Sequence, residues 1–288
     1  MFLSFRAGRR FRIALCAALL TAAALFRFAA ASAGARPRKS AELTIVMYHS
    51  IVKDPDRQGQ YVVSPAALES DMSYLRARGY ETVVVRDLID FVDRGVPLPE
   101  KPVMLTFDDG CYNNYLYAYP LALKYGMRIV ISPVGSYTDR YTQGDADHEI
   151  YSYLTWSEVA ELADSGAVEI QNHSYDLHGT SPRLGARKLR TESAAAYRAM
   201  LETDLRKMQD RVREMTGHTP TAFVYPYGIV SRESISVVRG LGFRASMVCE
   251  DRKNALTAGD PDCLFGLGRY LRPAGLSSES YFRRIGVV

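Results

Sequence analysis

Cysteine and tryptophan are scarce in this sequence, whose 288 residues include four Cys and one Trp. No two cysteines are spaced as Cys-x-x-Cys, which excludes a structural zinc site built on paired thiolates. Three cysteines follow residue 35, namely Cys111, Cys249 and Cys263. Cys249 and Cys263 could form a disulfide around a short loop in an oxidising compartment, and three unpaired thiols are the alternative.

Acidic residues are absent from the first 35 positions, which hold five arginines. Basic residues precede an uncharged apolar run at 13–26, and small residues at 31–35 offer candidate cleavage sites. This layout is typical of a secretory signal peptide. The apolar run is shorter than the roughly 20 residues that span a bilayer, and an uncleaved anchor is the alternative. We therefore expect an exported protein (extracellular, cell-envelope or periplasmic) with a leader at 1–35, a linker at 36–42 and one domain at 43–288.

The basic excess of the chain belongs to this leader. The formal net charge is +4 and the isoelectric point is about 8.8, but the charge becomes −1 without the five leader arginines. No nucleic-acid partner is therefore expected. Contact with a membrane is expected only through an uncleaved leader.

Strands and helices alternate over the rest of the chain. Apolar runs predict strands, and capping signals before apolar stripes predict helices. Ser64-Pro65 and the capping box Thr155–Glu158 mark two helix starts. The predicted strands are 43–48, 82–85, 103–107, 128–131, 168–171, 221–225 and 245–249, and the predicted helices are 64–79, 87–93, 155–163, 185–215 and 231–239. This alternation favours an α/β fold with a parallel sheet closed into a barrel.

Polar side chains directly follow several predicted strands. His49 ends the first strand, Asp108-Asp109 ends the third, and His173 ends the fifth. Because strand ends of a parallel barrel converge on one face, these side chains are expected to share a pocket. Two adjacent carboxylates leaving an apolar strand repel each other unless a cation neutralises them. A solvated Asp-Gly turn is the alternative.

His173 and His178 are five residues apart. Neither a helix nor a strand brings two residues at this spacing to one face. Only a turn through 174–177 lets the two imidazoles converge, and two His with one carboxylate form a common open zinc site. The alternative is two loop histidines that never meet.

Three motifs resemble those of the NodB-like polysaccharide deacetylases, carbohydrate esterase family four. They are Thr106–Gly110 (TFDDG), His173–His178 (HSYDLH) and Phe223–Gly228 (FVYPYG). They occur in the family's order, and the resemblance covers about 43–250. It implies a distorted (β/α)7-type barrel, the NodB homology domain. It also implies a hydrolase that removes N-acetyl groups from polysaccharide containing N-acetylglucosamine.

The resemblance also implies residue roles, carried over by motif position. Asp109, His173 and His178 would hold one divalent metal, and Asp108 would be the base. The backbone N–H of Tyr227 would help to stabilise the oxyanion. Zinc is the first expectation for this ligand set, with Co, Ni and Fe as alternatives.

The sequence departs from the family at two points. Val224 stands where the third motif usually has an Arg that orients the base. No histidine follows His218, so the late motif that supplies the general acid is missing. Residues 47–50 (MYHS) resemble the branch of exported poly-β-1,6-N-acetylglucosamine deacetylases, in which a histidine ending the first strand is the acid. This resemblance assigns the acid role to His49, and a packed structural histidine is the alternative.

Other readings stay open at this point. Arg269 and Arg272 could be structural or could contact the site, and His148 and His218 are expected in solvated loops. A peptidoglycan or chitooligosaccharide deacetylase would use the same chemistry. A non-catalytic carbohydrate-binding protein on the same fold is favoured by the missing late motifs and opposed by the intact Asp-Asp-His-His set.

Overall fold

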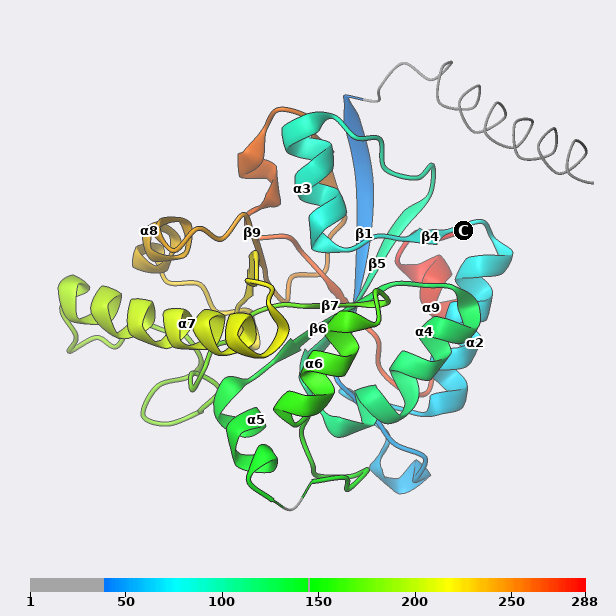
Figure 1. The fold of residues 1–288 in the computed structure, drawn as a ribbon. Coiled ribbons are helices and arrows are strands. Elements are labelled where there is room, and N and C mark those ends of the chain that lie inside the picture. Colours follow the sequence, from blue (N-terminus) through cyan, green and yellow to red (C-terminus); the bar gives the residue numbers. More distant parts are fainter. Residues whose placement is uncertain (1–38, 145) are drawn as a thin grey trace, which may run out of the picture. The chain divides into compact units, whose positions relative to one another are not determined.

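The computed structural model describes residues 39–144 and 146–288 (Figure 1). The leader predicted at 1–35 lies outside the described residues. Lys39–Val288 forms one unit by its internal contacts. Within that described part of the chain, no helix combines the length and the apolar character needed to cross a bilayer.

Parallel strands form the centre of the fold (Figure 1). In chain order the strands are β1 (Ser40–Tyr48), β2 (Ser50–Ile51), β3 (Val62–Val63), β4 (Glu81–Thr82), β5 (Pro102–Asp109), β6 (Ile129–Pro133), β7 (Val168–Ile170), β8 (Ala222–Val224), β9 (Ala245–Met247), β10 (Asn254–Thr257) and β11 (Tyr270–Leu271). β10 pairs antiparallel with the first half of β1, and β4 pairs with the start of β5. β2 and β3 form a separate pair.

The parallel strands follow one another around a closed ring. β1, β5, β6 and β7 pair in that order, and β8 pairs with β9. A bridge between Asn172 and Phe223 joins β7 to β8. A bridge between Met247 and Leu267 joins β9 to the segment before β11, which pairs with β1. The α/β barrel predicted from the alternation is confirmed, and its distortion lies at these single-residue bridges.

Helices surround the barrel (Figure 1). They are α2 (Pro65–Ala77), α3 (Val85–Arg94), α4 (Tyr119–Tyr125), α5 (Gly135–Thr142), α6 (Trp156–Asp164), α7 (Ala194–Thr216), α8 (Arg232–Gly240) and α9 (Ser278–Arg284). Short helical turns are η1 (Pro55–Arg57), η2 (Asn114–Ala118), η3 (Pro226–Gly228) and η4 (Pro261–Leu264). Ser64 caps α2, and Thr155 with Glu158 forms the predicted capping box of α6.

Several predicted boundaries were wrong. The strand predicted at 82–85 ends at Thr82, and the helix predicted from 87 begins at Val85. The helix predicted from Gly185 begins at Ala194, where Ser193 accepts a hydrogen bond from the N–H of Ala196. Gly185 instead has φ of 56° and lies so close to the loop after β8 that a Cβ would come within 2.7 Å of a carbonyl oxygen. The strand predicted from residue 43 begins at Ser40, because its first residues pair with β10.

Side chains alternate along the barrel strands between the barrel interior and the surrounding helices. On β5, Met104 packs in a buried cluster with residues of β1, β8 and β9. Leu105 and Phe107 pack in a second cluster with α2, α4 and α6. Asp108 lies an even number of residues beyond Met104, so it falls on the interior side, and it is 1% exposed. The period of the strand therefore places this carboxylate inside the barrel.

Candidate metal and catalytic site

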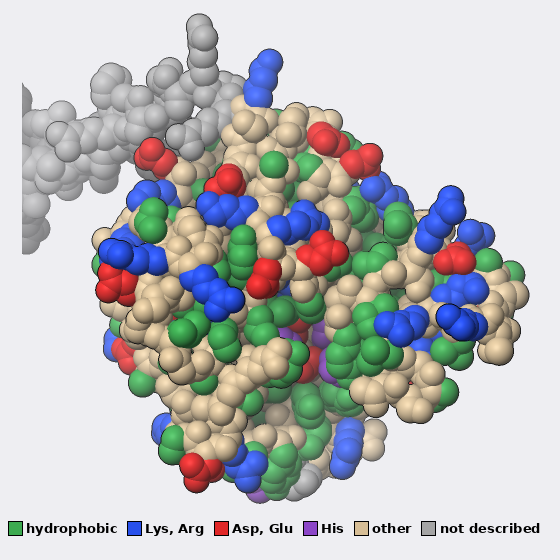
Figure 2. All heavy atoms as spheres, turned by 180° about the vertical axis from the view of Figure 1, so that it is seen from behind, with side chains coloured by type: hydrophobic (Ala, Val, Ile, Leu, Met, Phe, Trp, Pro, Cys, Tyr) green, Lys and Arg blue, Asp and Glu red, His purple; other side chains and the backbone are tan. Residues whose placement is uncertain are grey.

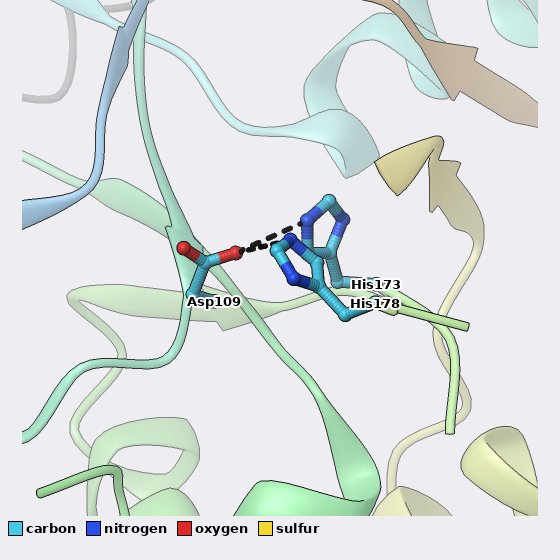
Figure 3. Close-up of side chains that lie close together, drawn as sticks. All are labelled: Asp109, His173 and His178. Carbon is cyan, nitrogen blue, oxygen red and sulfur yellow. Dashed lines mark ion pairs between the residues drawn. The ribbon is translucent and has the colours of Figure 1, made fainter. Parts of the chain in front are cut away.

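Asp109, His173 and His178 converge at the carboxyl ends of β5 and β7 (Figure 3). Each offers one ligand atom, and these atoms lie within 4.8 Å of one another. Asp109 Oδ1 is 3.0 Å from His178 Nε2 and 3.4 Å from His173 Nε2. The turn between the two histidines brings together side chains whose spacing suits neither a helix nor a strand.

Left-handed backbone conformations concentrate at this point. Asp109 has φ of 67°, Ser174 has φ of 75° and Tyr227 has φ of 58°. Such values are uncommon for residues other than glycine, and they persist where the surrounding structure enforces them. Each of the three residues turns the chain where it leaves a barrel strand. The strained backbone is therefore part of how the site is built.

Hydrogen bonds fix the orientation of both imidazole rings. His173 Nδ1 lies 2.8 Å from the carbonyl oxygen of Val224, which can only accept. This ring therefore carries its proton on Nδ1 and turns the lone pair of Nε2 toward Asp109. His178 Nδ1 lies 3.3 Å from the hydroxyl of Tyr227, which in turn donates to the His178 carbonyl at 3.0 Å. The same tautomer follows for His178.

This donor set fits a divalent metal ion. Two imidazole lone pairs face a carboxylate oxygen, and Asp109 Oδ1 is buried without a hydrogen-bond donor among the described residues. Burial raises the pKa of Asp109, but the neighbouring His173 and His178 outweigh it and hold that pKa well below its usual range. Burial lowers the pKa of His178, but Asp109 outweighs this and raises it. A bound cation can take the place of the protons that Asp109, His173 and His178 share when no metal is bound.

Arg269 holds the second carboxylate, Asp108. Its guanidinium donates to Asp108 Oδ1 at 2.7 Å and to Oδ2 at 2.8 Å. Arg269 is 0% exposed, and it is fixed further by the carbonyl of Val248 and the hydroxyl of Thr106. Burial raises the pKa of Asp108, but the charge of Arg269 outweighs it, so that the pKa is lowered.

Asp108 thus has an arginine partner, although the position where the family's third motif usually supplies one is Val224. Val224 contributes its backbone carbonyl to His173, and the guanidinium comes from the segment before β11. Arg272 has a different place, since it pairs with buried Asp71, which also accepts a hydrogen bond from Tyr48. The signal in the sequence was the pair of arginines at 269 and 272, but it did not say which of them enters the site.

His49 lies at the end of β1 and lines the same pocket. Its Nδ1 is buried and has no hydrogen-bond partner among the described residues. Asn114 donates to the backbone carbonyl of His49 at 2.7 Å, and the ring packs edge-on against Tyr61 at 5.0 Å between centroids. Burial lowers the pKa of His49, although Asp108 and Asp109 oppose the shift. The ring is thus held in place while its Nδ1 is left without a hydrogen-bond partner among the described residues.

These side chains lie in a pocket of about 760 Å³. Figure 2 shows it as a hollow in which red and purple side chains are ringed by green ones. Its lining includes Tyr61, Ile150, Tyr153 and Tyr227 together with the carboxylates and imidazoles. Tyr227 is 41% exposed, and its ring lies 4.7 Å from that of His178. All six residues predicted for the site therefore line one pocket.

The remaining predictions on cysteine and histidine also have outcomes. Cys111, Cys249 and Cys263 are free, so the alternative of a Cys249–Cys263 disulfide was wrong. Cys249 Sγ lies near Met47 and Arg269, whereas Cys263 Sγ lies near the backbone of Thr257. His148 and His218 are exposed, as expected.

Comparison with known proteins places these residues in a family context. Residues 95–246 match the family described as polysaccharide deacetylase. The chain is similar to the poly-beta-1,6-N-acetyl-D-glucosamine N-deacetylase of Escherichia coli (strain K12), with 30% identity over 217 residues, or 69% of this chain. It spans only 32% of the length of that relative.

Solved structures agree on the fold. A de-N-acetylase from Aggregatibacter actinomycetemcomitans superposes with a TM-score of 0.72 and 26% identity, covering 85% of this chain and 100% of that one. IcaB from Ammonifex degensii superposes with a TM-score of 0.67 and 23% identity over 85% of this chain and 96% of that one.

Proposed function

We propose, from the premise that this chain belongs to the polysaccharide deacetylase family, that it is an exported, metal-dependent hydrolase. Its proposed reaction removes N-acetyl groups from polysaccharide that contains N-acetylglucosamine. The convergence of Asp109, His173 and His178 beside a second buried carboxylate carries the proposal. The substrate class is supported by similarity to a relative named as a poly-beta-1,6-N-acetyl-D-glucosamine N-deacetylase.

Asp109, His173 and His178 would hold the metal through one carboxylate oxygen and two Nε2 atoms. A divalent metal bound there would lower the pKa of a water ligand and polarise the acetamide carbonyl. Zinc is the proposed ion because two imidazoles and one carboxylate with an open position suit it, and Co, Ni or Fe would suit the same set. The Val224 carbonyl would keep His173 in the tautomer that binds a metal.

Asp108 is the proposed base. Arg269 keeps its carboxylate ionised and fixes its plane. A carboxylate has about four lone-pair sites, so the two bonds to Arg269 leave others for the proton of the attacking water. Water oxygen then bonds to the acetamide carbon while its proton passes to Asp108.

His49 and Tyr227 complete the proposed reaction. The C–N bond breaks as the amine nitrogen takes a proton, and His49, which lines the pocket, is the proposed donor of that proton. Burial lowers the pKa of His49, so the proton that it delivers to the amine would be the one that Asp108 takes from the water. The backbone N–H of Tyr227 is the proposed donor to the developing oxyanion.

Export is part of the proposal and rests on the sequence of residues 1–35 alone. An arginine-rich start, a short apolar run and small residues form the order of a secretory leader. The enzyme would then act outside the cell, in the envelope or in the periplasm, where its polysaccharide substrate lies.

Acetate release by the purified protein tests the proposed function. The assay adds zinc, cobalt, nickel or iron and compares poly-β-1,6-N-acetylglucosamine, peptidoglycan and chitooligosaccharide as substrates. We expect release from the first glycan that stops when metal is chelated. Release from only one of the other two would change the proposed substrate. A metal-loaded protein that released acetate from none would favour the alternative of a non-catalytic carbohydrate-binding protein on this fold.

A further inference from the structure

A carboxylate from α7 holds the turn between the two histidines. Asp204 accepts the N–H of Tyr175 on Oδ1 at 2.8 Å and the N–H of Asp176 on Oδ2 at 2.8 Å. Successive backbone N–H groups that point at one anion form a concave binding unit. Both oxygens of Asp204 are therefore committed to residues 174–177, the turn that brings His173 and His178 together.

The N-terminus of α5 holds the same turn by donating hydrogen bonds to carbonyl groups of the turn. The N–H of Gly135 donates to the carbonyl of Ser174 at 3.1 Å, and the N–H of Ser136 donates to the carbonyl of Tyr175 at 2.7 Å. The approach is so close that a Cβ on Gly135 would lie 2.6 Å from the ring of Tyr175. Two helices thus bind the N–H groups and the carbonyls of one turn.

The Tyr175 side chain adds a third attachment to α7. Its hydroxyl donates to Asp139 at 2.6 Å, and Lys207 Nζ lies 3.5 Å from its ring centroid. Arg211 donates to the same Asp139 at 3.0 Å. Asp204, Lys207 and Arg211 follow the spacing of one helix face, so a single face of α7 serves this turn.

Folding disfavours the negative charge on Asp204. Burial raises the pKa of Asp204 to about 6, against the opposing effect of its two backbone hydrogen bonds. A neutral side chain would suit packing at this half-buried position better. The negative charge strengthens the hydrogen bonds that Asp204 accepts from the two N–H groups.

We propose that Asp204 is a positioning residue for the metal site. It fixes the turn at 174–177 and thereby sets the separation of the two imidazole ligands, without contacting the metal. The inference rests on the proposed metal site and goes beyond it, because it names a residue of α7 that controls affinity from outside the ligand set.

Asp204→Asn tests this role, with Asp210→Asn as a matched control on the same helix. Asp210 pairs with Arg213 at the surface, where both side chains are at least half exposed. The first measurement is zinc affinity, by competition with a chromophoric chelator. We expect Asp204→Asn to weaken binding about ten- to hundredfold, the range for changes just outside a ligand set, and Asp210→Asn to leave it unchanged. Asp204→Glu keeps the charge and should bind zinc more tightly than Asp204→Asn.

A second measurement uses no metal. Amide hydrogen exchange at Tyr175 and Asp176 should accelerate in Asp204→Asn, while exchange along α7 stays as in the wild type. Equal zinc affinity in the wild type and Asp204→Asn, or unchanged exchange at the two amides, would overturn the inference. A wild type that bound none of zinc, cobalt, nickel and iron would instead refute the proposed function, and the exchange measurement would still decide whether Asp204 holds the turn.

Discussion

The buried ion pair between Arg269 and Asp108 gives the most quantitative test of the site. Arg269 and Asp108 are 0% and 1% exposed, and two parallel hydrogen bonds of 2.7 and 2.8 Å join them. Arg269 has no contact with solvent, and Asp108 meets it only at the pocket that it lines. Arg269→Met keeps much of the side-chain volume and removes the charge. Asp108→Asn keeps the shape of its side chain and removes the opposite charge.

Each single substitution leaves one uncompensated charge inside the barrel, and breaking a buried pair in this way costs about 3–5 kcal/mol. The double substitution leaves no charge. The double substitution should therefore lower the free energy of unfolding by less than the two single substitutions do in sum. We expect this difference, the coupling energy of the pair, to be at least about 2 kcal/mol. Asp108→Asn should also keep the metal and lose activity, because the base is gone.

Urea unfolding measures these free energies. Trp156 is the one tryptophan of the chain and is buried, so its fluorescence reports the loss of the fold. A chelator in all samples removes the stabilisation that bound metal would add. Arg213→Met is the control, because its pair with Asp210 is exposed and such pairs contribute about 0–1 kcal/mol. Single effects as small as the control, or a double variant that shows their full sum, would refute the account of this pair.

Three further substitutions test the separate parts of the site. Asp109→Ala should abolish zinc binding in a competition assay and leave the far-UV circular dichroism unchanged, and retained stoichiometric zinc would remove Asp109 from the ligand set. His49→Ala should lower turnover about 10²- to 10⁴-fold, the usual contribution of an acid–base group, with the metal content unchanged; undiminished turnover would make His49 a packed structural residue. Gly135→Ala should push Tyr175 away and weaken zinc binding without touching a ligand, and wild-type affinity would show that the turn tolerates the shift.

The sequence predicted that Asp109, His173 and His178 would meet, because their arrangement depends on local rules. Alternation along β5 sends Asp108 into the barrel, and Asp109 begins the turn at its end. The spacing of His173 and His178 required a turn, and Ser174 supplies one with φ of 75°. Parallel strands bring their carboxyl ends to one face, so a few residues of context at each strand end were enough.

The partner of Asp108 could not be read in the same way. Arg269 lies 161 positions from Asp108, and their contact depends on how the ring closes between β9 and β11. That closure uses one bridge, between Met247 and Leu267, rather than a long strand with an apolar pattern. The absence of arginine at Val224 was correct as an observation, but it concerned one position in the chain rather than the space beside the carboxylate.

The start of α7 shows the same limit in the backbone. Residues 185–193 contain acceptable helix formers, yet Gly185 lies close to the loop after β8. The helix therefore begins only after the cap at Ser193. A tertiary contact therefore overrides local propensity at this point.

The groups that support the proposed ligands differ from those ligands in where they act and in how far the sequence reveals them. A ligand must present a particular atom, so its residue type and its place at a strand end are both constrained. Val224 acts through its backbone carbonyl, which almost any residue could supply. Gly135 acts through its N–H and through the absence of a Cβ, so no side chain marks its role in the sequence. Asp204 does act through its side chain, but it reaches the turn from the face of a helix that resembles any other amphipathic helix in sequence. It follows that ligand residues can be intact in a relative whose metal affinity differs greatly, and that measuring affinity in variants of Gly135 and Asp204 separates the two kinds of contribution.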